Sequence, residues 1–157
     1  MTLDTDRIQR DILIAAPVQR VWELITAAEH LGRWFGNAGA EIDLRPGGAM
    51  VLRWADHGIS RGRVVTVEPP HRFSYRWAPF KDPGGDEPVE GNSTLVEFTL
   101  EPDGDGTLLR VVETGFASLD LPAEEQAKRA DGNTEGWDYE MRDLGEYARS
   151  AQAASRR

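Results

Sequence analysis

An apolar stripe runs along the last part of the sequence, between Thr134 and Ala151. Its members recur at steps of four and three residues: Trp137, Met141, Leu144, Ala148 and Ala151. Charged residues fill most of the positions between them, so this spacing predicts an amphipathic helix. Such a helix needs an apolar surface against which to bury its stripe. Because most of the preceding segments read as short strands, we predict a curved sheet that wraps the helix.

Alternation of apolar and polar positions indicates the strands. The segment Arg72–Ala78, for example, places Phe73, Tyr75 and Trp77 on one face, which is typical of a strand with one buried side. Similar patterns predict strands at residues 7–14, 41–44, 49–55, 59–68, 72–78, 94–101 and 107–116. Two short helices are expected after the first strand, at 17–27 and 28–35, and Pro17 suits the first turn of the earlier one.

The order of these elements defines a fold class. A run of strands with helices segregated to the ends of the chain indicates an α+β fold with an antiparallel sheet. We find no repeat and no linker, so we predict one domain over residues 1–157, with a tail that frays from about residue 151. Asp131-Gly132-Asn133 predicts a kink or interruption of the last helix. The long irregular segment Pro79–Ser93 is either a lid or a mobile hairpin tip.

Composition narrows the environment and the partners. The 157 residues include no cysteine, which excludes disulfides and cysteine-ligated metals. The formal net charge of −9 argues against nucleic acid or an anionic membrane as a partner. The sequence contains neither a long apolar run nor the pattern of a signal peptide at its beginning. We therefore expect a cytoplasmic protein.

Several motifs resemble those of a known family. Ile14–Ile25 resembles the opening strand-to-helix segment of the START-like (SRPBCC) superfamily. Further motifs are similar to the branch named for homologues of the heat-shock protein 90 ATPase activator: Trp34-Phe35, Arg45-Pro-Gly-Gly48, Gly62–Pro69, Phe73–Trp77, Thr114-Gly115-Phe116 and Gly136-Trp137. The resemblance covers nearly the whole chain. It implies a helix-grip fold, in which a seven-stranded antiparallel sheet curves around the C-terminal helix and encloses a cavity.

Inward-facing apolar positions are the candidates to line that cavity. They are Trp34, Phe35, Met50, Leu52, Trp54, Phe73, Tyr75, Trp77, Val96, Phe98, Trp137, Met141 and Leu144. One helix against a curved sheet leaves a space that bulky rings can line without filling, and apolar pockets with a few polar groups are typical ligand sites. The alternative is that these side chains fill an ordinary core.

Polar candidates for the inward face are fewer. They are Arg53, Arg61, Arg63, Glu97 and Glu113. Strand alternation favours solvent for Glu97. Arg61 and Arg63 share a face with Val65 and Val67; a surface position is favoured, but if that face is inward, one arginine would meet a ligand carboxylate or pair with Glu113.

The sequence carries no recognisable catalytic or metal-binding motif. The histidines His30, His57 and His71 lack metal-ligand spacing, and no nucleophile elbow, phosphate loop or dinucleotide motif is present. We therefore predict no metal, no cofactor and no catalytic residue.

Three functions remain open, because the superfamily includes lipid carriers, hormone receptors, aromatic cyclases and co-chaperones. The favoured one is binding of an apolar or aromatic small molecule between the sheet and the last helix. The second is a co-chaperone-like interaction domain, in which Trp34, Phe35 and the segment 79–93 form an exposed patch. The third, less favoured, is an enzyme of the aromatic cyclase or hydrolase type that uses the same cavity. As partners we expect a hydrophobic small molecule and consider a homodimer and, with less support, a chaperone.

Overall fold

The computed structural model describes residues 7–36, 38–55, 58–78 and 87–155, with side chains described up to Ser150. Within these residues, seven strands form one antiparallel sheet: β1 (Arg7–Ile14), β2 (Ala40–Ile42), β3 (Ala49–Trp54), β4 (Gly58–Glu68), β5 (Arg72–Trp77), β6 (Thr94–Asp103) and β7 (Gly106–Thr114). The helices are α1 (Val18–Thr26), α2 (Ala28–Trp34), the 3-10 turn η2 (Phe116–Ser118) and α3 (Ala123–Ser155). The predicted α+β helix-grip fold is confirmed.

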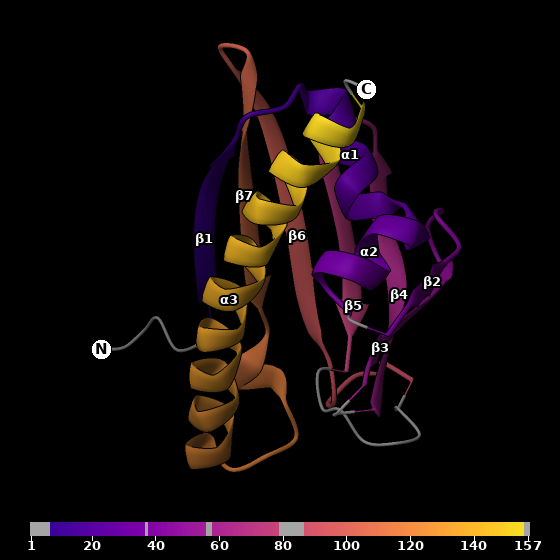
Figure 1. Ribbon diagram of the computed structural model, residues 1–157. Coiled ribbons are helices and arrows are strands. Elements are labelled where there is room, and N and C mark those ends of the chain that lie inside the picture. The colour runs from indigo at the N-terminus through magenta and orange to yellow at the C-terminus, as the bar shows by residue number, and fades with distance from the viewer. Residues whose placement is uncertain (1–6, 37, 56–57, 79–86, 156–157) are drawn as a thin grey trace.

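The sheet is a meander that is completed by the first strand. Its order is β1-β7-β6-β5-β4-β3-β2, so strands consecutive in sequence pair from β2 to β7, and β1 pairs with β7. Figure 1 shows the three helices on one side of the sheet, with α3 along β1, β7 and β6 and with α1 and α2 beside its upper part. The inward face of each strand carries the apolar side chains that the helices cover.

One strand departs from the simple alternation. A register shift at Val65 interrupts the pairing of β4 with β5. Val65 is exposed on the same face as Arg63, whereas Val67, beyond the shift, lies opposite Phe73 and packs against the core. The prediction that Val67 shares a face with Arg61 and Arg63 is wrong, because a bulge of this kind reverses the facing of the residues that follow it.

The last helix is continuous. α3 runs from Ala123 to Ser155, so the predicted interruption at Asp131-Gly132-Asn133 is wrong. A glycine inside a helix costs about 1 kcal/mol relative to alanine, and burial of the apolar stripe on this helix outweighs that cost. Fraying from about residue 151 stays a prediction. α3 is long but carries many charged residues. Within the described ranges, no helix is both long enough and apolar enough to cross a membrane.

Two sequence predictions fall outside the described residues. His57 is one of them, and residues 79–86 of the segment 79–93 are the other. The described end of that segment forms a turn in which the Asn92 side chain accepts a hydrogen bond from the Val89 backbone N–H at 2.8 Å. The Asn92 amide also donates to the backbone oxygen of Glu87 at 3.0 Å.

Candidate ligand-binding site

The residues predicted to line a cavity are all buried between the helices and the sheet. Most of them pack into one continuous core, in which Phe73 stacks against Phe98 at a centroid distance of 6.3 Å. Phe35, Trp77 and Trp137 differ from the rest, because they line a pocket between α3 and the sheet. Most of the aromatic rings therefore belong to an ordinary core, and a few form the wall of a pocket.

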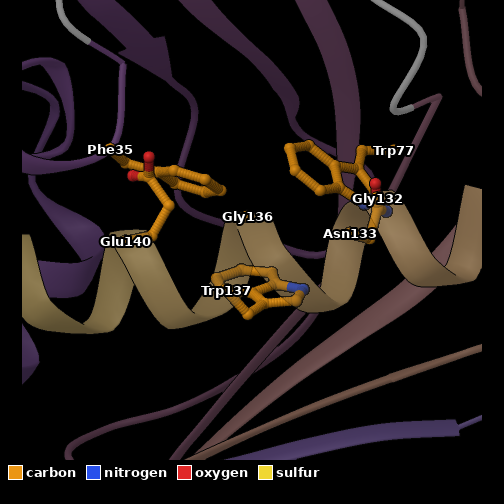
Figure 2. A pocket seen from close by; sticks show the side chains of 7 residues that line it. All are labelled: Phe35, Trp77, Gly132, Asn133, Gly136, Trp137 and Glu140. Carbon is orange, nitrogen blue, oxygen red and sulfur yellow. The ribbon is translucent and has the colours of Figure 1, made fainter.

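The pocket has a volume of about 100 Å³ and lies beside one face of α3 (Figure 2). Besides Trp137, the helix contributes Gly132, Asn133, Gly136 and Glu140 to its lining. Residues three and four positions apart lie on the same side of a helix, so these four form one strip along it. A Cβ atom at Gly132 or Gly136 would meet nothing within 4 Å. The missing side chains of these two exposed glycines keep the entrance open.

Three rings from different parts of the chain meet at the pocket. Phe35 follows α2 directly, Trp77 ends β5, and Trp137 lies on α3. The Phe35 centroid lies 5.4 Å from that of Trp77 and 5.4 Å from that of Trp137, and the two indoles are 6.1 Å apart. Trp34 stacks on Phe35 at a centroid distance of 5.1 Å and donates its indole N–H to the Leu24 backbone oxygen at 2.7 Å. Phe35 is thereby held in place.

A buried carboxylate lies behind the two indoles. Glu113, with 0% of its surface exposed, accepts the N–H of Trp77 at 2.9 Å and that of Trp137 at 2.8 Å. The Thr94 hydroxyl donates to Glu113 Oε2 at 2.5 Å, and the Asn133 amide donates to both carboxylate oxygens at 3.1 Å. Each oxygen is thus surrounded by donors, which satisfies the buried charge without a cation.

The hypothesis that an arginine pairs with Glu113 is wrong. Every hydrogen bond that Glu113 accepts within the described residues comes from a neutral donor. Arg63 instead pairs with Glu87 at 3.1 Å, with both side chains about half exposed. Glu97 pairs with Arg72 at 2.7 Å on the outer face of the sheet, as its expected solvent-facing position allows.

The negative charges affect a neighbouring phenol. Tyr75 lies fully buried on β5, and its hydroxyl has no hydrogen-bond partner within the described part of the chain. Burial raises the pKa of Tyr75 well above its ordinary value, and the charges of Glu113 and Glu140 raise it further. Tyr75 therefore stays a neutral phenol at physiological pH. Among the described residues, none of the side chains that line the pocket belongs to lysine or arginine.

His30 and His71, the two histidines that the structure describes, take no part in the pocket lining. His30 forms a hydrogen bond of 2.7 Å between its Nδ1 atom and the Tyr147 hydroxyl, which links α2 to α3. Across the described ranges, no group of three or more His, Asp or Glu side chains is placed to hold a metal ion.

Sequence reasoning found part of this site. Alternation along β7 places Glu113 on the same face as Leu109 and Val111, and Glu113 was among the polar candidates for the inward side. It identified Trp137 on α3 but missed the neighbouring lining residues Gly132, Asn133, Gly136 and Glu140, because Asp131-Gly132-Asn133 reads as an interruption of the helix. The available signal was the helical spacing of Gly132 and Gly136 beside the stripe that contains Trp137.

The sheet, the gripped C-terminal helix and the pocket between them together define a START-like domain. The family model described as "Activator of Hsp90 ATPase homolog 1-like protein" matches residues 15–149, so the chain belongs to this family. No curated protein matches the chain.

Solved structures of similar fold come from several bacteria. Protein MLL2253 from Mesorhizobium loti has a TM-score of 0.71 and 23% identity, covering 89% of this chain and 94% of its own. CalU16 from Micromonospora echinospora has a TM-score of 0.67 and 26% identity, covering 91% of this chain and 74% of its own. DynU16, a protein in the dynemicin biosynthetic locus, has a TM-score of 0.72 and 25% identity. The match covers 93% of this chain but only 48% of DynU16.

Proposed function

We propose that this domain binds a small molecule by inserting an apolar or aromatic group into the pocket beside α3. The observation that carries the proposal is the open pocket itself, which is lined by the rings of Phe35, Trp77 and Trp137 and by Gly132 and Gly136. Apolar pockets with a few polar groups are the usual form of a small-molecule site. Here the polar groups come from Asn133 and Glu140 (Figure 2).

The volume of the pocket limits what can enter. Pockets for drug-sized ligands measure about 300–1,000 Å³, and an apolar cavity of about 150 Å³ holds a benzene molecule. The 100 Å³ found here suits one small group of a larger ligand. Gly132 also borders an open depression of about 610 Å³ with Lys128, Asp131, Thr134 and Glu135. The rest of the ligand would lie across this surface.

One structural relative supports this function. DynU16 is a protein in a biosynthetic locus, a setting in which a small-molecule-binding domain is expected. The two chains share 25% identity and the same fold, and one fold hosts many functions.

The experiment is a binding screen with a variant in which the pocket is blocked. Trp77 and Trp137 lie in the pocket, so tryptophan fluorescence reports the entry of a small aromatic compound. Gly136→Leu should keep the fold, because open space surrounds the position, and should abolish the binding seen in the wild-type protein. Tyr139→Leu places the same side chain at an exposed position of α3 and should leave binding unchanged.

Two results would contradict the proposal. One is a wild-type protein that binds no compound in a broad library of small aromatic and aliphatic molecules. The other is a Gly136→Leu variant that unfolds at the same temperature as the wild-type protein, and so keeps its fold, yet binds the compound as tightly.

The two alternative functions differ in their support. The co-chaperone alternative needed an exposed patch at Trp34 and Phe35, and this part of it is wrong, because the residues are only 2% and 4% exposed. The enzyme alternative gains one observation, since the Glu140 carboxylate lines the pocket where an acid–base group would be required. Recovery of every bound compound unchanged after incubation would contradict the enzyme alternative.

A further inference from the structure

The pocket combines aromatic rings with negative charge. We propose that the group which enters it is a cationic ammonium, so that the domain binds positively charged amines in preference to neutral molecules of the same shape. This inference rests on the proposed function, because it names the class of ligand for the same pocket. Three features of the site support it, namely the rings that line the pocket, the hydrogen bonds of the two indoles, and the carboxylates of Glu140 and Glu113.

The rings offer several π faces within reach of one cation. Phe35, Trp77 and Trp137 have centroids 5.4 to 6.1 Å from one another and share the pocket wall. A cation is attracted to a ring when it lies within about 6 Å of the centroid, and tryptophan attracts it most strongly. An ammonium group in a space of about 100 Å³ beside these rings cannot be far from any of them.

The hydrogen bonds of the indoles strengthen this attraction. Trp77 and Trp137 both donate their N–H to the Glu113 carboxylate. Donation to an anion polarises the donor and shifts electron density towards its ring, which makes the ring face more negative. The same bonds fix both ring planes, so little conformational entropy is lost when a ligand enters.

The carboxylates determine the sign of the preferred charge. Glu140 lines the pocket, and Glu113 lies behind the indoles with neutral donors only. An ammonium would gain a favourable interaction with both negative charges, whereas an anionic ligand would be repelled by both. The net charge of −9 on the whole chain adds a longer-range attraction for cations.

The test uses two probes that differ only in charge. Choline carries a trimethylammonium group, and 3,3-dimethyl-1-butanol carries a tert-butyl group of the same shape in its place. We expect the dissociation constant of choline to be lower by at least about tenfold, as a partly desolvated cation–π contact predicts. The indole N–H signals of Trp77 and Trp137 in an NMR titration would report binding at this pocket rather than elsewhere.

A pair of charge-neutralising variants tests the role of Glu140. In the wild-type protein, the dissociation constant of the alcohol divided by that of choline should be at least about ten. In Glu140→Gln this ratio should fall towards one. Glu146→Gln removes a charge from the same helix outside the lining and should leave the ratio unchanged. Higher salt concentration should weaken choline binding and leave the alcohol unaffected, because only the cation interacts through charge.

The outcomes separate this inference from the proposed function. Equal affinity for both probes, or tighter binding of the alcohol, would overturn the cation preference and leave the proposed function in place. Binding of library compounds that are all neutral or anionic would do the same. If neither these probes nor any library compound perturbs the two indoles, both proposals fail together.

Discussion

Glu113 joins β5, β6, β7 and α3 through its two carboxylate oxygens. Oε1 accepts N–H groups from Trp137 and Asn133, and Oε2 accepts N–H groups from Trp77 and Asn133. The amide of a Glu113→Gln variant would place an NH₂ group against an indole N–H in either orientation. Because buried donors would then lack acceptors, we expect the free energy of unfolding to fall by about 3 kcal/mol, measured by urea denaturation.

An exposed glutamate provides the control for this substitution. Glu101→Gln on β6 removes the same charge at the surface and should change the free energy of unfolding by no more than about 0.5 kcal/mol. A Glu113→Gln variant as stable as Glu101→Gln would show that the buried carboxylate contributes little to the fold.

Tyr75 gives a prediction about alkaline pH. Burial, followed by the nearby charges of Glu113 and Glu140, raises the pKa of the Tyr75 phenol in the folded protein well above the value of about 10 that is usual for tyrosine. Above about pH 10 the unfolded chain releases this proton, whereas the folded protein retains it. The free energy of unfolding therefore keeps its full value below about pH 10 and falls as the pH rises further. In Tyr75→Phe this decline should be shallower, as urea denaturation across pH 9 to 11 would measure.

The same variant tests the buried hydroxyl at neutral pH. The Tyr75 hydroxyl has no hydrogen-bond partner within the described residues. Its removal relieves a desolvation cost, so Tyr75→Phe should be as stable as the wild-type protein or more stable by up to about 1 kcal/mol at pH 7. A clear loss of stability would show that the hydroxyl has a partner in solution, such as a buried water.

Among the elements, α3 combines two demands that oppose each other. Its glycines at 132 and 136 leave the pocket entrance open, yet glycine lowers the stability of a helix interior. Gly132→Ala should raise the free energy of unfolding by about 0.5–1 kcal/mol, because its Cβ enters open space, and chemical denaturation would measure the gain. The added methyl group narrows the entrance, so ligand affinity should fall in the same variant.

Gly145 is the matched control on the same helix. An added Cβ there would lie 3.0 Å from Ile12 Cδ1, so the gain in helix propensity would be partly offset by crowding. Gly145→Ala should therefore stabilise less than Gly132→Ala, and it should leave ligand affinity unchanged because Gly145 does not line the pocket. Equal ligand affinity in both variants would contradict the role given to Gly132.

At the scale of the whole molecule, the sequence was most informative where one periodicity governs a segment. Alternation located the strands and placed Tyr75 and Glu113 on the inward side, and helical spacing located the stripe of α3. Prediction from the sequence failed where tertiary packing overrides a local signal. Gly132 reads as a helix breaker in isolation, but burial of the stripe carries the helix through it. The bulge at Val65 had no local signature either.

The position of the pocket was beyond the reach of sequence patterns. A pocket is the space that remains after all neighbouring elements have packed, so it depends on where α2, α3 and β5 meet. Alternation identifies Phe73 and Trp77 equally as inward-facing, yet only Trp77 borders the pocket. The resemblance implied a cavity between the sheet and the last helix, and among the described residues the structure shows a small pocket beside α3.

The Glu113 hydrogen bonds also have a kinetic consequence. They connect side chains 19 to 36 positions apart in sequence, and those from α3 can form only after the helix has docked on the sheet. We expect this docking to follow the rate-limiting step of folding, and interactions completed after that step slow unfolding without speeding folding. In stopped-flow experiments, Glu113→Gln should therefore unfold faster than the wild-type protein and refold at nearly the same rate. Glu113 would then determine how long the assembled pocket persists rather than how quickly it forms.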